Sequence, residues 1–236
     1  ADLAIDHRLV HCGLMRWVGL VLAVIVLGGC TPVGGDSSPP PGPAASEAAG
    51  QLDSLTVASA RSMSGYSREK FPHWRLVDEN CDVRDAVLKR DGTGVEASRT
   101  CKVLRGSWFS AYDAKTYTAP DQIDIDHMVP LANAWRSGAD GWTEEQRTEF
   151  ANDLTRPQLL AVSRSTNRSK GDQDPSQWKP SNRDYWCEYA GRWVAVKFYW
   201  KLTVTDREKS ALREMLGSCR AQSSAPPTYL PAPAAS

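Results

Sequence analysis

Apolar and polar residues follow secondary-structure periods only in the middle of the chain, between about residues 51 and 220. Alternation over residues 100–110 and over a segment ending at Asp126 predicts two strands, and a short apolar run at 158–163 predicts a third. Apolar stripes, capping boxes and terminal glycines predict helices at residues 81–92, 143–154, 165–172, 183–202 and 205–217. These elements predict one α+β domain with a single buried core.

Polar residues gather where two predicted strands meet a helix. The stretch DIDHMVP ends one strand at Asp126 and His127, and strand 158–162 leads into a helix carrying Asn167 and Lys170. Adjacent residues at a strand end point to opposite faces, so Asp126 can bind a metal ion while His127 faces a water molecule. Asn167 offers an amide oxygen as a second ligand. Lys170 lies about one turn further along and is predicted to reach the same phosphate.

This set of side chains suits phosphodiester hydrolysis. The reaction needs a base that deprotonates water, and a neutral histidine meets that need at physiological pH. It also needs positive charge on the phosphate, which a divalent cation held by a few oxygen ligands supplies. A carboxylate and an amide with bound waters accept Mg²⁺, the expected cofactor, or Mn²⁺.

The motifs also resemble a known family. DIDHMVP, followed about thirty residues later by QLLAVSRSTNRSKGD, is similar to the HNH nucleases of the ββα-metal fold. The stretch from about Phe71 to Leu212, with CDVRDAVLKRD and IDHMVPLANAWRSGA, resembles exported HNH proteins related to the C-terminal domain of GmrSD-type restriction enzymes. The resemblance implies a metal-dependent endonuclease built around a ββα-metal core, with Asp126 and Asn167 as metal ligands and His127 as general base.

One position departs from the family pattern. The middle residue of the HNH triplet is usually Asn, whose side chain holds the loop between the strands and so orients the histidine. Here Gln158 stands nine residues before Asn167. We expect Gln158 to keep this role from a longer arm, and Asn133 and Asn152 are the alternative sources of the contact.

Further polar and aromatic residues have more than one interpretation. Asp124 shares a strand face with Asp126 and is a further ligand, a residue that orients a ligand, or a solvated acid. Arg84 either clamps a phosphate or pairs with an acid such as Asp85. A basic cluster is either a solvated face or a groove that follows a nucleic-acid backbone, with Arg168 as a candidate contact. Its members are Arg164, Arg168, Lys170, Lys179 and Arg183. The aromatic stripe over residues 183–202 is read as core, and Trp178 as the better candidate for touching a base.

Four cysteines fall within the predicted domain: Cys81, Cys101, Cys187 and Cys219. An even number of cysteines in an exported protein predicts disulfides, and sequence proximity favours Cys81–Cys101 and Cys187–Cys219. A zinc site is the alternative, but no C-x-x-C pair is present.

The ends of the chain have the composition of targeting and linker segments. Residues 1–30 carry the apolar run WVGLVLAVIVLGG and predict an export signal. Its last residues, L-G-G-C, resemble a bacterial lipobox in which Cys30 is lipidated, so we expect an outward-facing membrane lipoprotein. A plain secreted protein is the alternative. Residues 31–50 predict a disordered linker, 51–220 the nuclease domain and 221–236 a disordered tail.

Overall charge neither supports nor opposes a polyanion partner, because 28 Lys and Arg residues balance 28 Asp and Glu residues. The interpretation therefore depends on the site. It predicts a nucleic-acid substrate, DNA in preference to RNA, a membrane contact through the lipid anchor alone and no obligate protein partner. Two other readings are a non-catalytic envelope lipoprotein that binds nucleic acid and a structural envelope protein.

Overall fold

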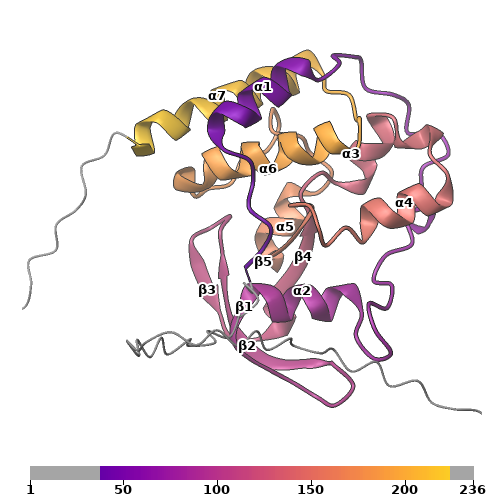
Figure 1. Cartoon of the computed structure of the whole chain (residues 1–236), viewed down its shortest axis with the longest axis vertical. Coiled ribbons are helices and arrows are strands. Elements are labelled where there is room, and N and C mark those ends of the chain that lie inside the picture. Colours follow the sequence, from indigo (N-terminus) through magenta and orange to yellow (C-terminus); the bar gives the residue numbers. More distant parts are fainter. Residues whose placement is uncertain (1–37, 224–236) are drawn as a thin grey trace, which may run out of the picture. The chain divides into compact units, whose positions relative to one another are not determined.

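The computed structural model describes residues 38–223 as an α+β domain (Figure 1). Its helices are α1 (Ala45–Ser54), α2 (Val83–Asp91), α3 (Leu131–Arg136), α4 (Glu144–Ala151), α5 (Arg164–Lys170), α6 (Trp186–Tyr199) and α7 (Asp206–Ser223). Its strands are β1 (Gly92–Ala97), β2 (Val103–Ser110), β3 (Lys115–Tyr117), β4 (Ile123–His127) and β5 (Leu159–Ser163). Short 3₁₀ turns are η1 (Arg68–Lys70), η2 (Pro120–Gln122), η3 (Ala139–Gly141) and η4 (Arg183–Tyr185).

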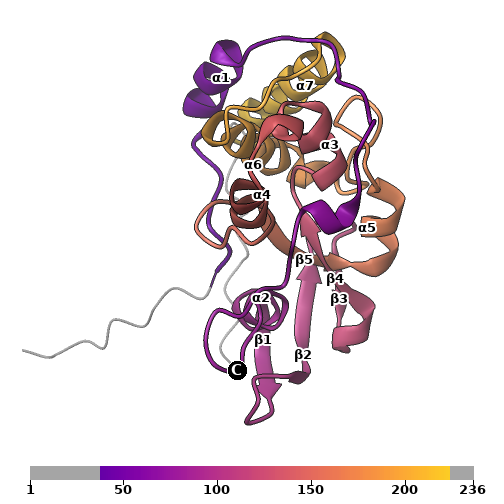
Figure 2. The same cartoon turned by 90° about the vertical axis from the view of Figure 1, so that its right-hand side faces the viewer.

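The strands form two antiparallel sheets, β1-β2-β3 and β4-β5. In the smaller sheet Ile123 pairs with Ser163 and His127 with Leu159. Helix α5 follows β5 directly and packs on both strands. Figure 2 shows β4 and β5 between the group α1, α6 and α7 and the long β1–β2 hairpin. The two strands that carry the polar motif are therefore enclosed by other elements.

Two apolar clusters hold these strands. One lies between α2, β2 and the β4–β5 sheet and includes Val87, Trp108 and Ile125. The larger one includes Tyr189 and Trp193 of α6 and joins that helix to its neighbours. This confirms that the stripe on residues 183–202 belongs to the core.

The free edge of β5 is closed by side chains of α2 in place of a third strand. Arg90 donates to the carbonyl oxygen of Leu159 at 2.6 Å, and the Asp91 carboxylate accepts from the amide of Ala161 at 2.8 Å. Unpaired edge groups are otherwise a template for aggregation. The end of α2 thus fixes the strand that leads into α5.

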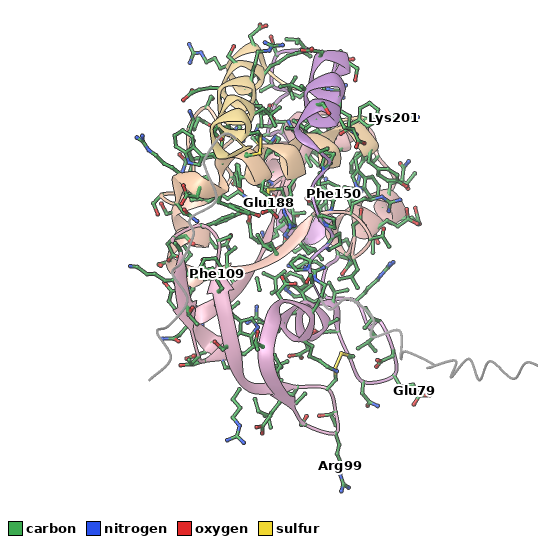
Figure 3. All side chains as sticks on the ribbon, turned by 60° about the vertical axis from the view of Figure 1, so that its left-hand side comes forward. Glu79, Arg99, Phe109, Phe150, Glu188 and Lys201 are labelled. Atoms are coloured by element: carbon green, nitrogen blue, oxygen red, sulfur yellow. A yellow bond between two sulfur atoms is a disulfide. The ribbon has the colours of Figure 1, made fainter. Side chains whose placement is uncertain are left out.

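Both predicted disulfides are present, Cys81–Cys101 and Cys187–Cys219. The first ties the start of α2 to the tip of the β1–β2 hairpin, where Figure 3 labels Arg99, and the second joins α6 to α7. In the chain-entropy model, each disulfide stabilises the folded state by about 3–4 kcal/mol, because it closes a loop in the unfolded chain. The zinc reading of these cysteines is wrong.

Most predicted elements are confirmed, including α2 ending at Gly92 and the capping box of Thr143 and Gln146 at α4. Three differences have a packing cause. β1 and β3 lack an apolar alternation and form by pairing with β2. Helix α7 continues through Gly217 into the predicted tail, because Met215 and Leu216 are buried and Cys219 is bonded to α6. Helix α1 begins inside the predicted linker, because Ala48 and Leu52 are buried in the larger cluster.

Within residues 38–223, no helix has the length and apolar content to cross a bilayer. The predicted signal segment 1–30 with Cys30, the start of the predicted linker at residues 31–37 and the tail beyond Ser223 lie outside the described residues.

Candidate functional site

A small pocket opens at the carboxyl end of β4. Its lining residues are Arg68, Ile125, Asp126, His127, Pro130, Leu131, Asn167, Gly171 and Asp172. The pocket thus brings Asp126, His127 and Asn167 together from β4 and α5, as the sequence predicts. Gly171 ends α5 with a positive φ of 52°, a conformation that favours glycine, and directs the chain so that Asp172 also lines the pocket.

The Asp126 carboxylate is buried, and its hydrogen bonds involve one oxygen only. Oδ2 accepts from the Tyr112 hydroxyl at 2.5 Å and from the Lys170 ammonium at 2.5 Å. Burial and the Asp126 charge raise the pKa of Tyr112, which keeps the phenolic proton available for donation. Both contacts hold Asp126 through Oδ2 and leave Oδ1 for a ligand. Tyr112 was missed by the sequence reading, because it lies in a turn with no apolar pattern.

Lys170 does not line the pocket. Its side chain is fully buried, and Nζ donates to Asp126 and to the carbonyl oxygens of His127 and Met128, the latter two at 2.9 Å. Three acceptors require three N–H donors, so the group is an ammonium ion. Burial lowers the pKa of Lys170, and the Asp126 carboxylate opposes that shift. The predicted phosphate contact is therefore corrected to a positioning role at the end of β4.

The orientation of the Asn167 amide follows from its neighbour Asp124. Asn167 Nδ2 donates to Asp124 Oδ2 at 3.2 Å. A carboxylate only accepts, so the nitrogen must face Asp124, and the amide oxygen Oδ1 is left for the pocket. Of the three readings of Asp124, this contact favours the orienting one, with Asn167 as the residue that is oriented. Arg164 Nε lies 3.8 Å from the other Asp124 oxygen.

His127 has a defined tautomer and is almost fully buried. Nε2 lies 2.9 Å from the carbonyl oxygen of Ala151. A carbonyl only accepts, so Nε2 carries the proton and Nδ1 has the free lone pair. Burial lowers the pKa of His127 to about 3. The imidazole is therefore neutral at physiological pH, as a general base requires.

A second aromatic segment encloses the His127 ring and was missed by the sequence reading. The Trp74 ring stacks on it with centroids 5.6 Å apart, and His73 approaches edge-on at 6.1 Å. Trp74 has a φ of 64°, which is strained for a bulky residue. Asn152 holds this turn, accepting from the Arg75 amide and donating to the carbonyl oxygen of Pro72. No periodic signal in the sequence indicates this contact.

Gln158 makes the loop contact expected of the usual Asn. It is fully buried, its Oε1 accepts from the Val129 amide at 3.1 Å, and its Nε2 donates to the Val129 carbonyl oxygen at 3.0 Å. Asn133 and Asn152 have other partners, Ser137 for the first and the turn before Arg75 for the second. One residue that precedes β5 thus makes both side-chain hydrogen bonds to Val129, in the loop after His127.

The remaining candidates lie elsewhere. Arg84 donates to the carbonyl oxygens of Pro120 and Ile123, at 3.3 and 2.9 Å, and so supports the entry to β4 outside the pocket. This corrects its reading as a phosphate clamp. Arg168 is exposed on α5 and does not line the pocket. Trp178 packs on Tyr112, with ring centroids 5.2 Å apart, which makes it a poor base-stacking residue. Lys179 pairs with Glu214.

The donor set fits a hard divalent cation that keeps several waters. Within residues 38–223, no group of three or more His, Cys, Asp or Glu side chains is placed to hold a metal. The pocket offers instead one carboxylate oxygen of Asp126 and one amide oxygen of Asn167, and the carboxylate of Asp172 also lines it. Mg²⁺ is commonly bound through one or two protein oxygens plus waters and substrate phosphate. Zinc sites are usually built from three or four protein ligands, mainly histidine and cysteine, and this donor set does not fit them.

Comparison with known proteins gives a family. Residues 82–215 match the model of the C-terminal domain of GmrSD restriction endonucleases. A protein of Arthroderma benhamiae, named as an uncharacterized secreted protein, is 49% identical over 203 residues, which is 86% of this chain and 98% of that protein. No solved structure matches. The matched residues include both strands and the helix that carry Asp126, His127 and Asn167, and the chain belongs to the family of the GmrSD C-terminal domain.

Proposed function

We propose that the protein is a metal-dependent HNH endonuclease that hydrolyses phosphodiester bonds in nucleic acid, with DNA as the preferred substrate. Family membership indicates a nuclease-related function. One observation carries the finer proposal: a neutral histidine with a free Nδ1 shares a pocket with a carboxylate and an amide oxygen. The order β4, β5, α5 supports a ββα-metal core.

In the proposed reaction His127 acts as general base. Nδ1 takes a proton from water, the water oxygen bonds to phosphorus, and the bond to the 3′ oxygen breaks. The products are a 5′-phosphate and a 3′-hydroxyl, whose proton comes from solvent. The Ala151 carbonyl oxygen accepts from Nε2 and thereby stabilises the charged imidazolium. General-base catalysis of this kind contributes about 10²–10⁴-fold in rate.

The other residues of the site hold these groups in place. Asp126 and Asn167 would bind Mg²⁺ or Mn²⁺, which supplies positive charge to the phosphate and the leaving oxygen when bound. Lys170 and Tyr112 orient Asp126, and Asp124 orients Asn167. Gln158 fixes the loop that follows the base.

The proposed location is the outside of the cell. The relative from Arthroderma benhamiae is named as secreted, which supports export of this chain. The lipidation of Cys30 is a separate proposal. It predicts incorporation of a labelled fatty acid into the wild-type protein and none into a Cys30→Ser variant. Labelling that persists in the variant would exclude Cys30.

The test of function is cleavage of supercoiled plasmid and of RNA by the oxidised protein, with Mg²⁺ or with EDTA, compared with a His127→Ala variant. We expect nicking that needs both the metal and His127. Cleavage by the variant at the wild-type rate would refute the general-base assignment. Salt-sensitive DNA binding without products, from a folded and metal-loaded wild type, would favour the non-catalytic binding lipoprotein.

A further inference from the structure

We propose that Arg68 is the residue that binds the scissile phosphate in this site. The inference rests on the proposed function. It replaces Lys170, which the sequence predicts to reach the phosphate, and the two candidate contacts Arg84 and Arg168.

Arg68 is the cationic side chain that the pocket presents to solvent. It is exposed and lines the pocket beside Asp126 and His127. Within residues 38–223 its guanidinium forms no hydrogen bond or ion pair with another residue. By contrast, the three donors of Lys170 are already used by protein acceptors. The cation available for a phosphate is therefore Arg68.

The backbone around Arg68 is held firmly although its side chain is exposed. Tyr66 and Phe71 pack their rings on Trp135, with centroids 5.9 and 6.4 Å apart. Arg147 donates to the carbonyl oxygen of Lys70 at 2.8 Å. Turn η1 is thus anchored on both sides, so the Arg68 side chain starts from a fixed position at the rim of the pocket.

The chemistry of a guanidinium suits this position. Its planar fork donates two parallel hydrogen bonds to the oxygens of a phosphate, which a lysine ammonium cannot do. A phosphate held by Arg68 would face Nδ1 of His127 and the oxygens of Asp126 and Asn167 across one pocket.

Arg68 lies before the matched region 82–215, in a part of the chain for which the family match gives no information. The same segment carries Trp74, which stacks on His127. The residues between α1 and α2 therefore complete a site whose ligands and base come from the matched region.

The first measurement is DNA affinity in a His127→Ala background, so that cleavage does not interfere. A fluorescent duplex is titrated at several salt concentrations with Mg²⁺ present. Adding Arg68→Ala should reduce the slope of log K against log salt by about one, the value for one lost phosphate contact. Arg99→Ala, at the tip of the β1–β2 hairpin (Figure 3), is the matched control and should keep the slope.

The second measurement is cleavage in the wild-type background. Arg68→Ala should lower kcat/KM by about 10²–10³-fold, the loss typical of one donor to a developing charge. The kcat/KM of Arg68→Lys should lie between those of the wild type and Arg68→Ala, because lysine keeps the charge but cannot donate two parallel hydrogen bonds. Millimolar guanidinium should restore part of the Arg68→Ala activity and leave His127→Ala inactive.

The results separate the two proposals. Wild-type cleavage with an Arg68→Ala variant that is unchanged in rate and salt slope overturns the assignment of Arg68 and leaves the endonuclease proposal standing. An equal fall in slope for Arg68→Ala and Arg99→Ala also overturns it, because it would reflect bulk charge. The third outcome is a wild type that does not cleave, together with an Arg68→Ala variant whose slope of log K against log salt is lower by about one. This outcome refutes the endonuclease proposal and supports the phosphate contact of Arg68.

Discussion

Replacing Lys170 by Met tests whether the buried ion pair holds the site in place. The change keeps a long side chain and removes the ammonium. It leaves the Asp126 carboxylate with Tyr112 as its remaining partner and deprives the carbonyl oxygens of His127 and Met128 of a donor. Breaking one side of a buried pair typically costs about 3–5 kcal/mol. For a domain of this size such a loss corresponds to a fall in Tm of roughly 6–20 °C.

The assay is guanidinium chloride unfolding of the oxidised protein in EDTA, so that neither a bound metal nor disulfide reduction contributes. Lys201→Met is the control, because Lys201 is exposed (Figure 3) and its loss should change the unfolding free energy by less than about 0.5 kcal/mol.

The double variant Lys170→Met with Asp126→Asn separates the lost pair from lost packing. Removing the unpaired charge should recover at least about 1 kcal/mol relative to Lys170→Met alone. A loss below about 1 kcal/mol in the single variant, with no recovery in the double one, would show that the pair does not stabilise the folded state.

Three further changes test other parts of the site. Burial lowers the pKa of His127 from 6.5 to about 3, so the unfolded state binds this proton first as the pH falls. The contribution of the neutral His127 to the unfolding free energy is fully present above pH 6.5. It is lost as the pH falls towards 3, by up to about 5 kcal/mol. Calorimetry should show that the unfolding free energy depends less steeply on pH in that window for His127→Gln than for the wild type. Equal slopes for the two proteins would contradict the buried neutral imidazole. Gln158→Ala should lower stability by about 1–3 kcal/mol, because two Val129 groups lose their partner, and Gln158→Asn should recover activity more than stability. Trp74→Ala should lower kcat with little change in KM, and Trp74→Phe should restore most of it. A Trp74→Ala effect on KM alone would assign the ring to substrate binding.

The local signals in the sequence predicted most of the elements near the site. The capping box of Thr143 and Gln146 and the alternation before Asp126 act over a few residues, and both appear where expected. The grouping of Asp126, His127 and Asn167 was also predictable, because a strand end and the next helix set their spacing. Whether a nearby side chain points inward was not predictable. Helical spacing puts Lys170 on the correct face of α5, but its burial depends on Tyr112, Tyr189 and Trp193 from distant elements.

Arg68 and Trp74 could not be assigned from the sequence for a different reason. Both lie on a segment without apolar periodicity, more than fifty residues before His127. Their positions depend on Trp135, which anchors η1, and on Asn152, which holds the turn at Trp74. Neither contact has a local signature. The strained φ of Trp74 is of the kind found at functional sites, and it becomes visible only in the folded chain.

The proposed metal ligand Asp126 and the proposed base His127 are held by contacts from two different helices. Lys170 holds Asp126 and the His127 carbonyl oxygen from α5, and Ala151 holds the His127 ring through Nε2 from α4. One ammonium thus contacts both the proposed ligand Asp126 and the backbone of the proposed base His127. Catalysis by positioning requires reacting atoms to be held before the substrate arrives. In the proposed reaction the buried Lys170 therefore positions other residues and does not contact the phosphate, and the exposed Arg68 is the residue proposed to meet the substrate.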